Sequence, residues 1–140
     1  RLRAHAVIAI SFADWMTGQS ATDPQAPFGS SSLSNLLAYA VGADLVSVPE
    51  AALPGITIVN DGGVDYPALT YRVRKGASTL AYEVETSGNL AAWQGGEAFT
   101  VEVGFPQDNG DGTETVTVRS VQPVTPGSSQ YLRLRILLPL

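Results

Sequence analysis

Alternation of apolar and polar residues is the main pattern in the second half of the chain, and it is clearest from Leu69 to Trp93. The apolar positions, two apart in each of two runs, are Leu69, Tyr71 and Val73, then Leu80, Tyr82 and Val84. A period of two places alternate side chains on opposite faces of a β-strand. Because the short polar segment Gly76-Ala77-Ser78-Thr79 separates the runs, the pattern predicts a β-hairpin with one buried and one wet face.

The register of this hairpin follows from matching the two faces. The expected cross-strand pairs are Lys75 with Leu80, Val73 with Tyr82, Tyr71 with Val84, and Arg72 with Glu83. The last pair joins opposite charges on the wet face, where such a pair contributes about 0.2–1 kcal/mol.

Further short segments show the same alternation, with turn residues between them. They are Ile56–Val59, Phe99–Val103, Thr115–Arg119 and Tyr131–Leu138. The dipeptides Asn109-Gly110 and Asp111-Gly112 favour the positive φ angles of tight hairpin turns. Short alternating strands separated by turns predict a mainly β protein, an antiparallel β-sandwich of the Ig-like or jelly-roll-like kind. Its expected single core comprises Tyr71, Val73, Tyr82, Val84, Trp93, Val101, Val116, Leu132 and Leu134.

Two short helices are expected before the sheets. Ser11-Phe12-Ala13-Asp14 has the form of a capping box, and apolar residues at helical spacing follow it as far as Gly18. In the second helix the apolar residues Leu33, Leu36, Leu37, Ala40 and Val41 share one face. Ser32 is its expected N-cap and Gly42 its expected C′ residue.

The first ten residues also alternate, which predicts a strand at the start of the chain. Its apolar face comprises Leu2, Ala4, Ala6, Ile8 and Ile10. The expected organisation is therefore an N-terminal strand over 1–10, a helical head over 11–48 and a sandwich over 49–140. A chain of 140 residues has the length of one compact domain.

The composition of the chain excludes some classes of binding partner and some kinds of site. The net charge is −5, which argues against nucleic acid, because binding to its phosphates requires clustered Lys and Arg. The sequence has no Cys, so disulfides and thiolate metal sites are excluded. It contains no apolar run of membrane-spanning length.

No set of residues in the sequence has the form of a catalytic site. His5 is the only His, and it lies beside Arg3 on the polar side of the first strand, without the nucleophile and orienting group that a base needs. Glu83 and Glu85 could imitate paired glycosidase carboxylates, but arginines across the expected hairpin favour ion pairs instead. We therefore expect no enzyme and no cofactor.

Two other features have a functional and a structural interpretation. Asp108-Asn109-Gly110-Asp111-Gly112 resembles a calcium loop superficially, but Gly110 interrupts the alternate oxygen ligands, and a hairpin turn explains the glycines better. Aromatic side chains could stack on sugars; most of them occupy expected core positions, whereas Tyr66 and Tyr131 are candidates for exposed aromatic contacts.

The order of several segments resembles a β-rich module at the C-termini of large secreted bacterial proteins. The segments that carry the resemblance are Trp15 in its short helix, Leu33–Asp44, Leu69–Arg74, Tyr82–Ser87, Leu90–Trp93, Asp111–Arg119 and Tyr131–Arg135. It covers roughly Phe12 to Ile136. In that family a thrombospondin type 3 or dockerin-like calcium repeat usually precedes the second helix. Here only Asp23 remains of its acidic ligands, and Ala38 stands where the family has Glu.

The resemblance implies a secreted carrier module rather than an enzyme. We expect a non-enzymatic extracellular structural or assembly module at a bacterial cell surface, forming filaments with copies of itself through its N-terminal strand. The alternative is a sorting module that binds cell-surface polysaccharide and attaches a larger secreted protein. The first requires a free strand or self-complementary surfaces, and the second requires an exposed aromatic row.

Folding is expected to be independent of divalent metals, because the segment from Asp23 to Ser32 lacks the clustered oxygen ligands that calcium needs. Adding a chelator should leave the melting temperature unchanged, as measured by circular dichroism. A sharp fall in the melting temperature, restored by added Ca²⁺, would contradict this expectation.

Overall fold

The computed structural model describes residues 12–18, 23–27, 34–42, 53–77 and 80–138. This part of the chain contains two helices, α1 (Phe12–Gly18) and α2 (Asn35–Ala40), followed only by strands. The strands are β1 (Gly55–Asp61), β2 (Val64–Arg74), β3 (Ala81–Ser87), β4 (Gln94–Gly95), β5 (Thr100–Glu102), β6 (Gln107–Asp108), β7 (Thr113–Ser120) and β8 (Tyr131–Leu137).

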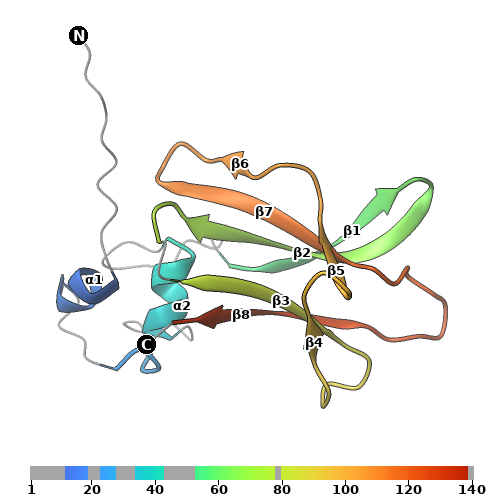
Figure 1. The fold of residues 1–140 in the computed structure, drawn as a ribbon, viewed down its shortest axis with the longest axis horizontal. Helices are drawn as coiled ribbons and strands as arrows, with labels where there is room; N and C mark the ends of the chain where they lie inside the picture. Colours follow the sequence, from blue (N-terminus) through green and yellow to red (C-terminus); the bar gives the residue numbers. More distant parts are fainter. Residues whose placement is uncertain (1–11, 19–22, 28–33, 43–52, 78–79, 139–140) are drawn as a thin grey trace, which may run out of the picture.

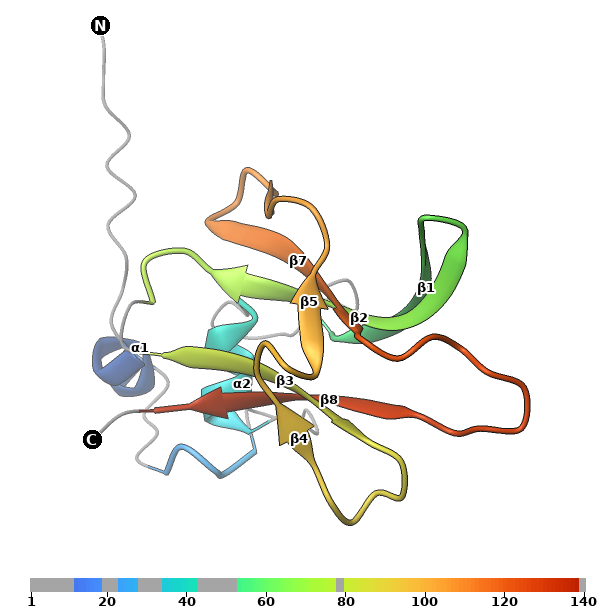
Figure 2. The same ribbon diagram turned by 45° about the vertical axis from the view of Figure 1, so that its right-hand side comes forward.

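The strands form two antiparallel sheets that face each other, as Figures 1 and 2 show. The first sheet has the order β1-β2-β7-β5, with β6 also pairing with β7, and the second has the order β4-β3-β8. Helix α2 lies at the end of the sandwich where β2 and β8 finish. The predicted mainly β sandwich with two short helices is therefore confirmed.

The predicted hairpin of the two longest alternating runs is wrong, because β2 and β3 belong to different sheets. Their apolar faces meet across the interior, where the rings of Tyr71 and Tyr82 stack with centroids 6.3 Å apart. The predicted register is therefore wrong as well. Tyr71 does not pair with Val84: Tyr71 pairs with Val116, and Val84 pairs with Leu134. Alternation determines which side of a strand is buried, but it does not determine which strand lies beside it.

The real hairpin in this region joins β1 to β2. Gly62 and Gly63 link Asp61 to Val64 with φ angles of 63° and 87°. Two consecutive positive φ angles are what a two-residue turn with the twist of its strands requires, and glycine adopts them at little cost. The second hairpin, β6 to β7, contains Gly110 and Gly112, both at positive φ as predicted.

The apolar interior is divided into two clusters of buried residues rather than the single core that we expected. One lies between the sheets and comprises Leu69, Tyr71, Val84, Val116 and Val118. The other joins the helices to the end of the sandwich and comprises Phe12, Trp15, Met16, Leu36, Ala38, Tyr39, Ala40 and Leu80. Tyr82 packs against both clusters, so its ring connects the helical head to the sandwich.

Two residues assigned to the core lie elsewhere. Val101 pairs with Arg119 on the outer side of the first sheet and is 39% exposed. Trp93 belongs to neither cluster; its ring lies 4.2 Å from the guanidinium carbon of Arg133. Val101 belongs to a strand of only three residues, Thr100 to Glu102, which is too short for alternation to indicate the buried face.

The predicted helices are confirmed with one correction. Helix α1 ends at Gly18 and buries Phe12, Trp15 and Met16. The N-cap of α2 is Ser34, whose Oγ accepts a hydrogen bond from the backbone N–H of Leu37 at 3.2 Å. The predicted N-cap Ser32 lies outside the described residues, as do Ser11, Leu33 and the whole predicted strand from Leu2 to Ile10.

The C-terminal end of α2 is attached to the sheets by two side chains. The last carbonyls of a helix have no partner within the helix. Here the Tyr82 hydroxyl donates to the carbonyl of Ala40 at 2.7 Å, and Arg74 Nε donates to that of Tyr39 at 2.7 Å. The Tyr82 hydroxyl also accepts from the backbone N–H of Arg74 at 3.2 Å. Residues from both sheets therefore hold the helix end, and the positive charge of Arg74 suits its dipole.

Replacing Tyr82 with Phe should lower the free energy of unfolding by about 1–3 kcal/mol, because it removes the hydrogen bonds of the Tyr82 hydroxyl to the carbonyl of the buried Ala40 and to the Arg74 N–H. Tyr71→Phe is the matched control, since no hydrogen bond to the Tyr71 hydroxyl exists among the described residues. Chemical denaturation measures the free energy of unfolding of both variants. Equal losses in the two would show that the Tyr82 hydroxyl does not join the helix to the sheets.

Candidate assembly surface

One side of the sandwich is incomplete in the described structure. In the first sheet β1 lies at the edge beyond β2, and in the second sheet β8 is the edge strand. Strand β2 contacts β8 across the interior, and β5 contacts β3. This alignment leaves β1 without a facing strand among the described residues, so the second sheet is one strand short on this side. We call this side of the sandwich the β1–β8 margin.

The consequence appears in the side chains of β1. Ile56 pairs with Leu69 and Ile58 pairs with Pro67, and both partners are buried, so the two isoleucines share the inner face of the sheet. They are nevertheless 62% and 55% exposed. An inward face that is apolar and uncovered is the kind of surface that takes part in protein–protein contacts.

A groove runs beside these isoleucines. It has a volume of about 340 Å³ and is lined by Ile56 and Ile58 on one side and by Tyr131, at the start of β8, on the other. Pro67 and Val124 add further apolar surface. Among the described residues β8 pairs only with β3, so the backbone groups on its other edge are available to an added strand.

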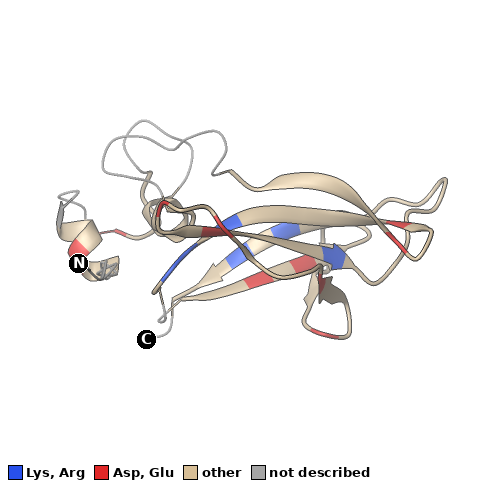
Figure 3. Cartoon of the chain, turned by 90° about the horizontal axis from the view of Figure 1, so that it is seen from above, with Lys and Arg blue, Asp and Glu red and all other residues tan. Residues whose placement is uncertain are grey.

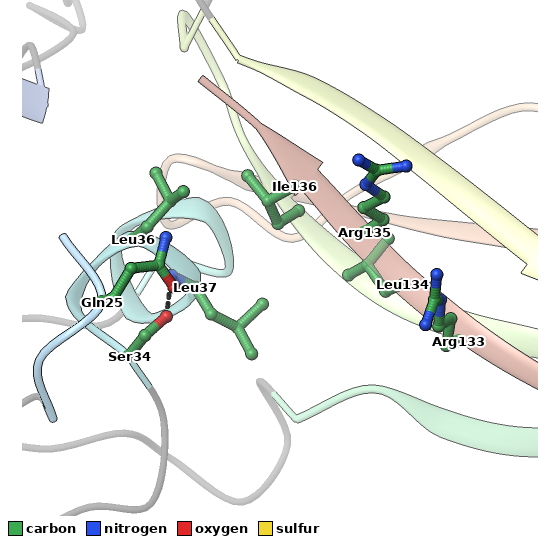
Figure 4. A pocket seen from close by; sticks show the side chains of 8 residues that line it. All are labelled: Gln25, Ser34, Leu36, Leu37, Arg133, Leu134, Arg135 and Ile136. Atoms are coloured by element: carbon green, nitrogen blue, oxygen red, sulfur yellow. Dashed lines mark hydrogen bonds between the residues drawn. The ribbon is translucent and has the colours of Figure 1, made fainter.

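A second hollow lies at the other end of β8, where the strand approaches α2. It has a volume of about 350 Å³. Figure 4 shows Leu36 and Leu37 of α2 on one side of it and Leu134 and Ile136 of β8 on the other, with Ile136 pointing toward the helix. Gln25, Ser34, Arg133 and Arg135 also line it, so its lining is mixed. The edge of β8 that pairs with no described residue therefore has a hollow at each end.

The outer face of the second sheet carries charges of both signs. Glu85, only 7% exposed, accepts hydrogen bonds from Arg133 at 2.7 Å, and Arg135 lies 3.6 Å from its other oxygen. The acidic positions lie on β3 and the basic ones opposite them on β8, and Figure 3 shows red and blue segments on neighbouring strands. Burial acts to raise the pKa of Glu85, but the hydrogen bond and charges of the two arginines outweigh it and lower that pKa. The arginines come from β8, not from β2 as the hairpin prediction required.

The turn before β7 is a hairpin, as predicted, and its carboxylates are engaged within the chain. Asp108 lies 2.6 Å from the Lys75 ammonium, and that hydrogen bond lowers its pKa. Asp111 accepts a hydrogen bond from the Thr113 hydroxyl at 2.6 Å, which is the main cause of its own lowered pKa. No group of three or more potential metal ligands occurs among the described residues.

The two aromatic residues singled out in the sequence have different surroundings. Tyr131 is 37% exposed at the mouth of the groove. Tyr66 is half-buried on the outer side of β2, and the Arg119 guanidinium lies 3.9 Å from its ring centroid, which leaves less of the ring free to stack on a sugar. The structure thus brings Tyr131 to the candidate surface and places Tyr66 away from it.

Sequence reasoning missed the residues that define this surface. Ile56 and Ile58 have the alternation typical of a covered strand, and nothing in the sequence indicates that the opposite sheet ends before reaching them. Phe105, which is 94% exposed between β5 and β6, was also not anticipated. An aromatic residue flanked by Gly104 and Pro106 was the available signal for an exposed loop tip.

Comparisons with protein-family models, curated proteins and solved structures found no match. Neither helix in the described part of the chain has the length and apolar character needed to cross a membrane.

Glu85→Gln should lower the free energy of unfolding by about 1–3 kcal/mol at neutral pH, because it removes charged hydrogen bonds from a buried group. The folded-state pKa of Glu85 is lowered, so this stabilisation is present above the ordinary carboxyl range and is lost as the pH falls through the folded value. The difference between wild type and variant should therefore shrink in acid. Urea denaturation across pH measures it.

The matched control for this prediction is Glu114→Gln, which makes the same change of charge on β7, where no ion pair is formed with a described residue. The Glu114→Gln variant should have nearly the same free energy of unfolding as the wild type at every pH. A Glu85→Gln loss that stays constant from neutral to acidic pH would show that packing, rather than charge, stabilises this face.

Proposed function

We propose that this protein is a non-enzymatic extracellular assembly module that accepts a β-strand at the β1–β8 margin, and that the donor is the segment from Leu2 to Ile10 of a second copy. The observation that carries the proposal is the exposed inner face of β1, at Ile56 and Ile58. A strand added beside β8 would face β1 and complete the second sheet.

The sequence of the donor segment suits a strand that packs one face against the groove. Its apolar residues lie two apart, so a strand would present them all to one side. Strand β8 has 7 residues, and the segment from Leu2 to Ile10 is long enough to pair along all of it. Main-chain hydrogen bonds would supply affinity, and the side chains entering the groove would determine the register.

The assembly that follows is a chain of subunits. A donor segment at one place and an acceptor groove at another make a heterologous contact, and such contacts form filaments when they do not close into a ring. The low content of charged residues, 15%, and the resemblance to secreted bacterial modules support a location outside the cell. Binding of the margin to cell-surface polysaccharide is the competing function, and it would depend on stacking against Tyr131.

The experiment replaces a residue that lines the groove and measures the molar mass of the assemblies by multi-angle light scattering. Ile58→Lys places a charge where the donor should pack, so the protein concentration needed for assembly should rise by about tenfold or more, equivalent to about 1.4 kcal/mol. Deleting residues 1–10 should also abolish assembly. An excess of the peptide Arg1–Ile10 should dissociate the intact assemblies.

Phe105→Lys is the matched control, because it places a lysine at another exposed apolar residue, one that does not line the groove. It should assemble as wild type does. The proposal is wrong if the protein is a monomer with residues 1–10 in its own sheet, if the deletion leaves assembly intact, or if Phe105→Lys prevents assembly while Ile58→Lys does not.

A further inference from the structure

The end of the sandwich away from α2 has a polar interior where an apolar one is expected. Strands β3 and β7 finish there and β8 begins there (Figure 1); we call it the far end. Thr86 follows the buried Val84 by two residues on β3, and Ser120 follows the buried Val118 by two on β7. Side chains two apart share a face of a strand, so both hydroxyls occupy inward positions. The apolar interior therefore ends in hydroxyl groups on both sheets.

A cavity of about 210 Å³ lies at the far end, lined by residues of both sheets. Thr86 and Gln94 come from the second sheet and Ser120, which is only 2% exposed, from the first. Phe99, half-buried just before β5, and Gln130, just before β8, also line it. Its volume is below the roughly 300–1,000 Å³ of sites for drug-sized ligands, so it suits one small ring.

Several polar groups of this wall have hydrogen-bonding capacity to spare. Ser120 Oγ accepts from the backbone N–H of Gln122 at 3.0 Å, and no described residue accepts its hydrogen. Gln130 Nε2 donates to the carbonyls of Gln122 and Pro123 at 3.1 and 3.0 Å, which fixes the amide and leaves its Oε1 without a partner among the described residues. The side-chain amide of Gln94 makes no hydrogen bond with a described residue. The wall thus offers both donors and acceptors.

The Ser87 hydroxyl, which also lines the cavity, has a structural role instead. It accepts from the backbone N–H groups of Asn89 and Leu90 at 3.1 and 2.9 Å and donates to Asn89 Oδ1 at 3.2 Å. These bonds use its donor and both of its acceptor positions. Ser87 therefore stabilises the turn that borders the cavity, and we assign it no contact with a ligand.

The absence of charge narrows the class of ligand. None of the described residues that line the cavity is charged, so an ionic group would leave water there without an opposite charge to meet it. A purely apolar ligand would leave the buried Ser120 hydroxyl hydrogen without an acceptor. A neutral ligand with several hydroxyl groups and one apolar face satisfies both conditions, and a sugar ring has that chemistry.

We propose that the far end binds a single neutral sugar ring. Its hydroxyl groups bond to Ser120, Gln94 and Gln130, and its C–H face packs on Phe99, whose ring supplies the apolar part of the wall. The proposal does not rest on strand acceptance at the β1–β8 margin. Ser129 and Gln130 line both the cavity and the groove, but Ile58 lines only the groove and Ser120 only the cavity.

Saturation-transfer difference NMR tests the proposal, because it observes the sugar and so works on the full chain whether or not subunits have assembled. The probes are the methyl glycosides of glucose, galactose, mannose and N-acetylglucosamine, and saturable binding of at least one is expected. Ser120→Ala and Gln94→Ala should each weaken that binding by about threefold to tenfold, which corresponds to the loss of one hydrogen bond. Phe99→Leu should weaken it by a similar factor.

Ser128→Ala is the matched control, since Ser128 lies in the same loop before β8 and does not line the cavity. It should bind the sugar as wild type does. Because Gln94 is exposed on the short strand β4, Gln94→Ala keeps the test valid even if a variant at a buried position is poorly folded.

The proposal is overturned if none of the sugars binds saturably, or if Ser120→Ala and Gln94→Ala both bind as tightly as Ser128→Ala. It is also overturned if charged methyl glucuronide binds as tightly as methyl glucoside, or if butanol or the neutral peptide N-acetyl-triglycine amide binds more tightly than every sugar. The size of Ile58→Lys assemblies tests the groove alone, so failure of sugar binding and failure of strand acceptance are distinguishable.

Discussion

The passage of the chain from one sheet to the other between β2 and β3 is the constraint on which the rest of the structure depends. Because these strands face each other instead of pairing, the rings of Tyr71 and Tyr82 meet in the interior. Tyr82 then comes within hydrogen-bond distance of the helix end at Ala40. The crossing also leaves β2 free to pair with β1 and β7, which makes the first sheet wider than the second.

The sequence predicts the elements of this fold better than their arrangement. Strands, turns and both helices follow from alternation, glycine positions and the 3.6-residue period, all of which are local signals. Strand partners are determined by contacts between distant segments. The same alternation at Tyr71 and Val84 fits both a hairpin and two facing strands, and only packing in three dimensions distinguishes them.

The β1–β8 margin shows a second limit of sequence reasoning. Ile56 and Ile58 have the pattern of core residues, and whether they are covered depends on the number of strands in the opposite sheet. At these two residues the apolar residue type conflicts with an exposed place in the sandwich, and such conflicts are expected at functional sites.

The two edge strands β8 and β5 differ in the side chains that they turn toward the interior. Soluble β proteins usually protect an edge with charges that point inward, with proline or with a covering loop. Strand β8 places its arginines on the outer face, where Glu85 binds them, and leaves Leu132 and Leu134 on the inner face. Strand β5 instead carries the exposed Glu102 opposite Val118 of β7, so a strand added there would have to bury that charge. An added strand is therefore disfavoured at β5, whereas β8 presents no such charge on its inner face, which is why the proposed acceptor edge is β8.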